Sequence, residues 1–225
     1  MCGICDNKCT ADTTEINCCH NVDSIPPEAI NLTILYCGWS NVIELPADAI
    51  NLGILSCSGT LINVLPDTFV NLVYLYCYST LITVIPYNFV NLVTLDCGNT
   101  SIASLPDTLI NLVNLNCSRT LITTIPAKAI NLVNLNCSGT QITTIPDTLV
   151  NLVDLYCYET LISTLPSTLK NIKYISSDNK PFVILYKYKF NYMDIDFTSR
   201  YKKLSTLYEC SVLPLDVYRH YKFYF

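Results

Sequence analysis

The sequence predicts an all-β solenoid, in which short coils of the chain stack on one another. Three residue types recur with a 20-residue period along most of the 225-residue chain, and such a fixed period is the signature of a stacked-repeat protein. Prolines keep this step from Pro26 to Pro166, and asparagines keep it from Asn31 to Asn171. The cysteines on the same grid are Cys37, Cys57, Cys77, Cys97, Cys117, Cys137 and Cys157.

Each repeat holds one short segment whose pattern predicts a half-buried strand. Leu135, Asn136 and Cys137 alternate between apolar, polar and apolar character. Strands at equivalent positions are expected to lie about 4.8 Å apart in one parallel sheet on the concave side. A proline nine residues after each cysteine disfavours a helix, and only four residues separate it from the next asparagine. The convex side is therefore expected to be extended or 3₁₀-like, in a horseshoe or right-handed coil with few helices and capped ends.

This repeat resembles the leucine-rich repeat, whose usual core is LxxLxLxxNxL. Residues 131–146 read NLVNLNCSGTQITTIP, with Cys at the third leucine position and Thr at the usual Asn position. The resemblance covers roughly residues 14–178 and recurs about eight times. The 20-residue length and the Ile/Leu-Pro ending look like the short repeats of bacterial effector proteins. The Cys variant, with its Asn-, Ile- and Tyr-rich composition, is similar to the repeats of amoebal giant viruses.

Composition divides the chain into three parts. Residues 1–25 are predicted to form a Cys-rich N-terminal cap with a degenerate first repeat, residues 26–178 the solenoid, and residues 179–225 an aromatic, basic C-terminal cap or tail. A solenoid has to cover its exposed core at both ends, so atypical sequence is expected there. Up to position 178 the chain carries five basic and 14 acidic side chains, a net charge of −9, whereas the segment 179–225 carries eight basic and four acidic ones, a net charge of +4.

Composition also limits the partners and the compartment. An acidic solenoid repels nucleic acid, whose binding needs clustered Lys and Arg. No apolar run approaches the roughly 18 residues that span a bilayer, and the N-terminus lacks the charged and apolar regions of a signal peptide. Thirteen cysteines, seven of them on the grid, suit a reducing compartment. We therefore expect an intracellular, cytoplasmic protein, which would lie in the host cytoplasm if it is viral.

The regular cysteines, threonines and asparagines are interpreted as structural. Free cysteine behaves as a small buried hydrophobe, so a column of thiols can pack inside the coil without disulfides or metal. The threonine three residues after each ladder cysteine from Cys57 onward can donate a hydrogen bond to a carbonyl in the turn. The asparagine can satisfy backbone groups just before the strand, where an unpaired polar group would lower stability.

The residues beside the buried strand positions are expected to face outward on the concave sheet, and they vary between repeats. They predict two partner-binding patches separated by an Asn/Ser floor, because Tyr and Trp offer a large contact area with one polar tip. The aromatic patch consists of Tyr36, Trp39, Tyr74, Tyr76 and Tyr78. The acidic patch consists of Asp154, Tyr156, Tyr158 and Glu159. The alternative interpretation is that these tyrosines only pair across strands.

The N-terminal cysteines leave three alternatives open, namely a zinc site, one or two disulfides, or reduced thiols. Cys2, Cys5 and Cys9 with a fourth ligand have a spacing that suits zinc, and that ligand is Cys18, Cys19 or His20. The segment also looks like the cysteine cap of extracellular leucine-rich repeats, which would imply two disulfides among Cys2, Cys5, Cys9 and Cys18. Because Cys18 occupies the grid position of a first repeat, it can belong to the core and leave Cys19 or His20 as the ligand.

These features predict a non-catalytic module that binds a protein on its Tyr/Asn-rich concave face, such as a viral protein that engages a host protein. The two histidines lie at opposite ends, no Gly-rich phosphate loop is present and no carboxylates pair, so neither an enzyme nor a cofactor beyond the zinc alternative is expected. One alternative is a structural solenoid that self-assembles as a homodimer through its edges. Another is a ubiquitin-ligase adaptor, because residues 213–218 resemble the opening of an F-box.

Overall fold

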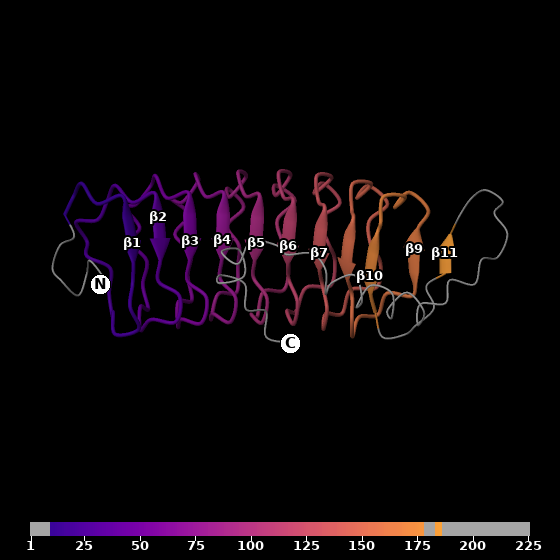
Figure 1. Cartoon of the computed structure of the whole chain (residues 1–225), viewed down its shortest axis with the longest axis horizontal. Coiled ribbons are helices and arrows are strands. Elements are labelled where there is room, and N and C mark those ends of the chain that lie inside the picture. Colours follow the sequence, from indigo (N-terminus) through magenta and orange to yellow (C-terminus); the bar gives the residue numbers. More distant parts are fainter. Residues whose placement is uncertain (1–9, 178–182, 186–225) are drawn as a thin grey trace, which may run out of the picture. The chain divides into compact units, whose positions relative to one another are not determined.

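The strands are short, and each coil contributes one of them to the main sheet (Figure 1). The computed structural model describes residues 10–177 and 183–185, and this part of the chain contains strands and turns but no helix. Cys2, Cys5, Cys9 and the F-box-like residues 213–218 lie outside the described residues. The strands are β1 (Glu15–Asn17), β2 (Ile34–Tyr36), β3 (Ile54–Ser56), β4 (Tyr74–Tyr76), β5 (Thr94–Asp96), β6 (Asn114–Asn116), β7 (Asn134–Asn136), β8 (Asp154–Tyr156), β9 (Thr164–Pro166), β10 (Tyr174–Ser176) and β11 (Val183–Leu185).

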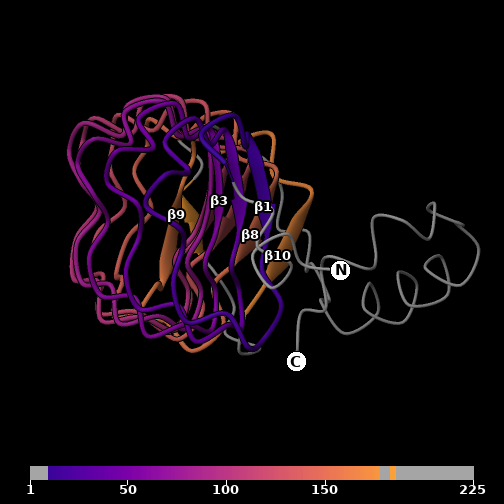
Figure 2. The same ribbon diagram turned by 90° about the vertical axis from the view of Figure 1, so that its left-hand side faces the viewer.

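Nine of these strands form one parallel sheet, as the repeat predicts. Strands β1 to β8 and then β10 follow each other across the sheet in chain order. From β2 onward each strand is offset from the one before it by a single repeat, so that Leu35 pairs with Leu55 and Leu55 with Leu75. Figure 2 shows β1, β3, β8 and β10 on one side of the coil and β9 on the opposite side. The constant register places the central leucines in one column inside the coil.

The first and last described coils are each one residue shorter than the others. At the N-terminal end, β1 pairs with β2 through Ile16 and Leu35. On the other side of the coil, β9 pairs in parallel with β11 through Leu165 and Ile184. Strand β11 therefore continues the coil beyond residue 178, where the repeat pattern of the sequence ends.

The interior of the coil is filled by aliphatic side chains and thiols. The central leucines of β2 to β8 are buried, and so are Ile62 and its equivalents on the far side. The thiols from Cys37 to Cys137 are buried and form no disulfide. A fully buried leucine contributes about 1.5–3 kcal/mol relative to an exposed one, so the leucine column is a major source of stability. The cysteine ladder is part of this packed core, as its regular spacing predicts.

Two polar ladders satisfy backbone carbonyls between and within the coils. Thr120 Oγ1 donates to the carbonyl of Cys117 at 2.6 Å, and five further threonines make the same bond. Ser40 replaces threonine in one coil and keeps the bond. Asn131 Nδ2 donates to the carbonyl of Ile110 at 3.0 Å, and five further asparagines repeat this 21-residue step. The structural interpretation of both ladders is confirmed.

Cys18 occupies the first cysteine position of the coil. Its N–H donates to the carbonyl of Tyr36 at 2.7 Å, which is the bond that Cys37 makes with Ser56 one coil later. The side chain of Cys18 is partly buried and packs against the core. Cys18 therefore takes part in the coil at the position that the grid gives it.

Candidate protein-interaction surface

The outward side chains of the sheet form rows that run across the strands. In β4 the two residues beside the buried leucine are Tyr74 and Tyr76, which align with Thr94 and Asp96 in β5. We call this surface the sheet face; it consists of the outward residues of β2 to β8 and the residue after each ladder cysteine. A partner lying on the sheet face would contact side chains from several coils at once.

The middle of the sheet face is a floor of hydrogen-bonded side chains. Asn134 Nδ2 donates to Oδ1 of Asn114 at 2.6 Å, one coil away. In the neighbouring row, Asn116 Nδ2 donates to Oδ1 of Asp96 at 2.9 Å. The Oδ1 atom of Asn116 also accepts the N–H of Ser118 at 3.1 Å, which ties the floor to the following turn. These bonds hold the floor in one arrangement, which is a property of preorganised binding surfaces.

The structure brings the predicted aromatic patch together on one side of this floor. Tyr36 and Tyr76 lie in the same row, with Ser56 of β3 between them. The exposed members of the patch are Trp39 and Tyr74, and the partly buried members are Tyr36, Tyr76 and Tyr78. The patch thus combines anchored rings with accessible ones, an arrangement typical of protein interfaces.

The acidic patch lies on the other side of the floor, on β8 and the turn after it. Tyr158 is 49% exposed, Glu159 is exposed, and Asp154 is partly buried. The ring of Tyr156 packs against Tyr174 of β10, with ring centroids 5.1 Å apart and an interplanar angle of 48°. Tyr174 therefore extends the patch. Sequence reasoning missed it because β10 belongs to the last coil, in which serine replaces the ladder cysteine.

One residue of the floor is ionisable, and sequence reasoning did not single it out. Burial raises the pKa of Asp96 from its ordinary 3.8 to about 6, although hydrogen bonds from the N–H of Gly98 and from Asn116 act to lower it. The sequence could have indicated it by position, because Asp96 is the only acidic residue among those that directly precede the ladder cysteines. The floor between the two patches therefore changes its charge near pH 6.

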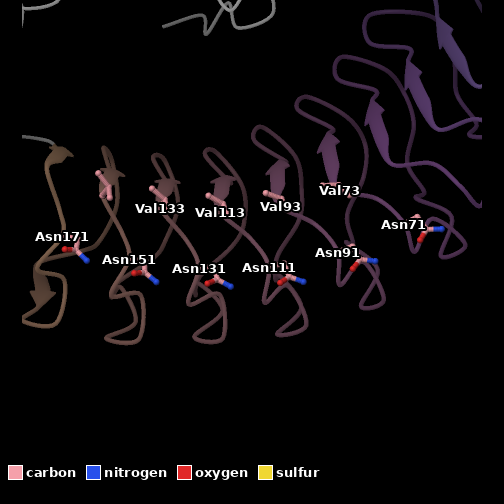
Figure 3. A pocket seen from close by; sticks show the side chains of 11 residues that line it. Asn71, Val73, Asn91, Val93, Asn111, Val113, Asn131, Val133, Asn151 and Asn171 are labelled. Atoms are coloured by element: carbon pink, nitrogen blue, oxygen red, sulfur yellow. The ribbon is translucent and has the colours of Figure 1, made fainter.

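A groove of about 910 Å³ runs along the coils where the chain enters the strands. Figure 3 shows its asparagine side chains in one row and its valine side chains in a second row nearer the strands. The lining residues are Asn71, Asn91, Asn111, Asn131, Asn151, Asn171, Val73, Val93, Val113, Val133 and Val153. Each coil that lines the groove contributes the same asparagine, and all but the last add the same valine. The asparagine Nδ2 atoms are committed to backbone carbonyls. The sheet face, which varies from coil to coil, is the better candidate for selective binding.

Neither a cluster of metal-binding side chains nor a membrane-spanning helix occurs in the part of the chain that the structure describes. That part contains no group of three or more His, Cys, Asp or Glu side chains that could hold a metal ion. Cys19 is partly buried, and His20 Nδ1 lies 2.8 Å from the carbonyl oxygen of Trp39, to which it can donate. Because the other candidate ligands lie outside the described residues, the zinc site stays a prediction. No helix in the described ranges is long and apolar enough to cross a membrane.

The thiols of the cysteine ladder have low reactivity. Burial raises the pKa of Cys57 from 9.0 to about 12, and it also raises the pKa values of Cys77 and Cys117 well above 9.0. The thiolate is the form of cysteine that attacks disulfides and binds metals. These thiols therefore stay protonated at neutral pH and act as core side chains.

The parallel sheet and the 20-residue coil define the fold of the leucine-rich repeat proteins, and solved structures of that class are similar to this chain. A leucine-rich repeat protein of Leptospira interrogans is 21% identical, with a TM-score of 0.63 over 73% of this chain and 48% of its own. The leucine-rich effector YopM of Yersinia pestis is 18% identical, with a TM-score of 0.64 over 81% and 52%. A chain of the Drosophila Toll–Spatzle complex is 19% identical, with a TM-score of 0.63 over 77% and 29%.

This chain thus spans about half of the first two structures and less of the third. No family model and no curated protein sequence matches it. At these identities the likeness establishes the fold, so the resemblance to leucine-rich repeat proteins is confirmed at that level. The similarity to giant-virus repeats stays a prediction from composition.

Proposed function

We propose that this protein is a non-catalytic interaction module that binds a protein partner on the sheet face. The observation that carries the proposal is the pair of aromatic patches on either side of a hydrogen-bonded floor. The patches are centred on β4 and β8, which are four strands apart in the sheet, or about 19 Å. A separation of this size fits within one protein interface of standard area, about 800 Å² per partner.

The chemistry of the two patches suits a protein partner. Tyr and Trp are enriched among the residues that dominate binding energy at protein interfaces, and the acidic side chains near Tyr158 favour a partner with basic groups. The similar chain in the Toll–Spatzle complex supports a binding role for a solenoid of this fold. The Cys-type repeats and the Asn-, Ile- and Tyr-rich composition support the finer proposal of an intracellular viral protein that engages a host protein.

The test is recovery of a partner by the tagged full-length chain from an amoebal lysate, followed by patch variants. Tyr76→Ala truncates the aromatic patch, and Tyr156→Ala truncates the acidic one. Each is expected to reduce recovery of the specific partner at least about fivefold, the effect of losing one important interface residue. Circular dichroism and the thermal midpoint would show whether each variant keeps its fold.

A matched control is provided by Tyr87, which is 75% exposed in a turn away from the sheet. Tyr87→Ala removes the same side chain from the opposite part of the coil and is expected to leave recovery unchanged. If both patch variants still retain the partner, the proposed function is wrong. If Tyr87→Ala abolishes recovery while they do not, the binding surface lies elsewhere on the coil.

A further inference from the structure

Asp96 lies in the floor of the sheet face, between the aromatic patch and the acidic patch. It belongs to β5, which stands between β4 of the aromatic patch and β8 of the acidic patch. In its row it pairs with Tyr76 on β4 and with Asn116 on β6. The side chain is only partly buried, so a partner that contacts both patches would cover it.

One oxygen of the Asp96 carboxylate is engaged and the other is available. Oδ1 accepts the N–H of Gly98 at 3.3 Å and Nδ2 of Asn116 at 2.9 Å. Within the described residues, Oδ2 accepts no hydrogen bond and Asp96 forms no ion pair. An ionised carboxylate accepts hydrogen bonds through both oxygens, so Oδ2 retains the capacity for a further donor.

The fold does not require a negative charge at this position. Asn116 and Asn136 stand at the equivalent position of the next two coils, and the Oδ1 atom of each accepts the N–H of the residue two positions later. An amide therefore supports the following turn as well as a carboxylate does, without the cost of a partly buried charge. Natural sequences break such a local rule chiefly at functional sites.

An aromatic ring borders the carboxylate. A Cβ atom added to Gly98 would lie 3.0 Å from Cδ2 of Tyr78, so the Tyr78 ring lies over Gly98. Gly98 is also the residue whose N–H donates to Asp96 Oδ1, which places the ring beside the carboxylate. A carboxylate beside a tyrosine ring can hold a cation through a charge-assisted hydrogen bond and a cation–π contact.

The described coils provide no positive charge at this site. Their Lys and Arg side chains are Arg119, Lys128, Lys170 and Lys173. Arg119 is the nearest of these to Asp96 along the chain, but its side chain lies over Gly139 of the following coil, on the side away from β5. The counter-charge for Asp96 is therefore not part of the described coils.

We infer that Asp96 binds a positively charged side chain, from lysine or arginine, that the protein partner inserts into the floor of the sheet face. This inference rests on the proposed function, because it names the group of the partner that the sheet face recognises. The cation donates to Oδ2, since Oδ1 is already engaged. A metal ion needs several ligands, and the described residues contain no group of three or more His, Cys, Asp or Glu that could hold one.

The first test uses nuclear magnetic resonance of the full-length protein, with N-acetyl-arginine methylamide and N-acetyl-lysine methylamide as probes. The control probe is N-acetyl-citrulline methylamide, which has nearly the shape of the arginine derivative but no charge. The backbone amide of Gly98 and the side-chain amide of Asn116 both donate to Asp96 Oδ1, so their signals report on the carboxylate.

We expect at least one charged probe to shift both signals with a dissociation constant of about 6–80 mM, the strength of one charge-assisted hydrogen bond. The tighter of the two probes identifies the basic group that the site prefers. No saturable shift up to about 100 mM at constant ionic strength, or an equal shift with the citrulline derivative, would overturn the inference.

Asp96→Asn removes the charge and keeps the shape of the side chain. The variant is expected to fold, because asparagine stands at the equivalent position of the next two coils. It should abolish the response of Gly98 to the charged probes. Asp147→Asn, the same change at an exposed turn away from the sheet, should leave that response unaltered. A response of Gly98 that survives in Asp96→Asn would mean that the cation binds another acidic side chain, and the inference is wrong.

The same two variants test the partner itself. Asp96→Asn is expected to reduce recovery of the partner from the lysate at least about tenfold at neutral pH, because it leaves the partner's basic group covered and without its counter-charge. Asp147→Asn should leave recovery unchanged. Undiminished recovery by Asp96→Asn would show that the partner places no charge at this site.

Failure of this inference can be told apart from failure of the proposed function. If Asp96→Asn retains the partner but Tyr76→Ala loses it, the sheet face binds a protein without a basic group at Asp96, and only the further inference falls. If recovery is insensitive to Tyr76→Ala, Tyr156→Ala and Asp96→Asn alike, both proposals fall.

Discussion

Asp96 is the residue at which the sheet face departs most from its own pattern. Its neighbours in the row, Asn116 and Asn136, each accept an N–H from the residue two positions later through Oδ1. Asp96 makes the equivalent bond with the N–H of Gly98 at 3.3 Å, but its carboxylate adds a negative charge to a partly buried position. The geometry of the row therefore favours an amide, and the charge lowers stability whenever the group is ionised.

We predict that Asp96→Asn stabilises the protein at neutral pH. Folding raises the pKa of Asp96 from 3.8 to about 6, so the stability associated with its protonated form is fully present below about pH 4 and is lost as the pH rises through about 6. The variant should have a larger free energy of unfolding than the parent at about pH 8, by up to about 3 kcal/mol. Urea denaturation at a series of pH values measures this difference.

The pH dependence of these urea denaturation measurements tests whether charge causes the effect. The difference between Asp96→Asn and the parent should shrink steadily as the pH falls from about 7 to about 4, because the protonated carboxyl resembles the amide in charge. Asp147→Asn, at an exposed turn on the far side, is the matched control and should show no such trend. A constant difference at all pH values would mean that hydrogen bonding, and not charge, sets the effect.

At the scale of the element, the turn after each strand depends on the residue at its positive-φ position, which is the second residue after the ladder cysteine. Gly59 and Gly139 both have a φ of 70°, a conformation that costs a non-glycine residue about 1–2 kcal/mol. They differ in their surroundings, because a Cβ at Gly59 meets the rigid indole of Trp39, whereas one at Gly139 lies 3.1 Å from Cγ of the flexible Arg119 side chain. A comparison of alanine substitutions at the two sites therefore distinguishes the cost of backbone strain from the cost of lost packing.

Gly59→Ala is therefore predicted to destabilise the protein more than Gly139→Ala. Both variants lose about 1–2 kcal/mol to backbone strain, and Gly59→Ala also displaces the Trp39 ring from the Gly59 backbone. Urea denaturation gives the two free energies of unfolding, and iodide quenching of Trp39 fluorescence should increase in Gly59→Ala only. Equal destabilisation with unchanged quenching would show that the indole does not rest on Gly59.

The strands were predictable from the sequence because the period itself fixes their register. A 20-residue step with leucine and cysteine two positions apart leaves one way to bury both, and β2 to β8 follow it. Strand β11 was not predictable, because Leu185 stands where the repeat has its proline and the strand joins β9 through a 19-residue step. The contact of Trp39 with Gly59 could not be predicted from the sequence either, because it depends on how neighbouring coils pack.

The same distinction holds for the candidate site. The sequence placed the tyrosines of both patches on the outward positions, because alternation in a strand determines which residues face away from the core. It could not indicate the charge behaviour of Asp96, which arises from its burial and from the side chain of Asn116 in the adjacent strand. Nor did it indicate that Tyr174 packs on Tyr156, which requires β10 to follow β8 directly in the sheet.

On the scale of the whole molecule, the cysteine ladder couples stability to pH in six successive coils. In a solenoid each coil is stabilised mainly by its neighbours, so a column of identical side chains acts on every interface in the same direction. Folding raises the pKa of Cys57 from 9.0 to about 12 by burial, and five further ladder thiols shift in the same direction. Above pH 9 the unfolded chain therefore releases protons that the folded chain retains.

We predict that the free energy of unfolding falls steeply as the pH rises from about 9 towards 12. Each buried thiol contributes a slope of about 1.4 kcal/mol per pH unit in that range, because its folded pKa lies above its unfolded one and its stabilising effect is lost with rising pH. Urea denaturation between about pH 8 and pH 10.5 measures the slope. Tyrosines and lysines also titrate in this range, so the parent is compared with Cys57→Ala. The variant should have a slope that is smaller by the contribution of one thiol, with the contributions of all other groups unchanged. An unchanged slope in Cys57→Ala would mean that the ladder thiols do not govern alkaline unfolding and that exposed groups do.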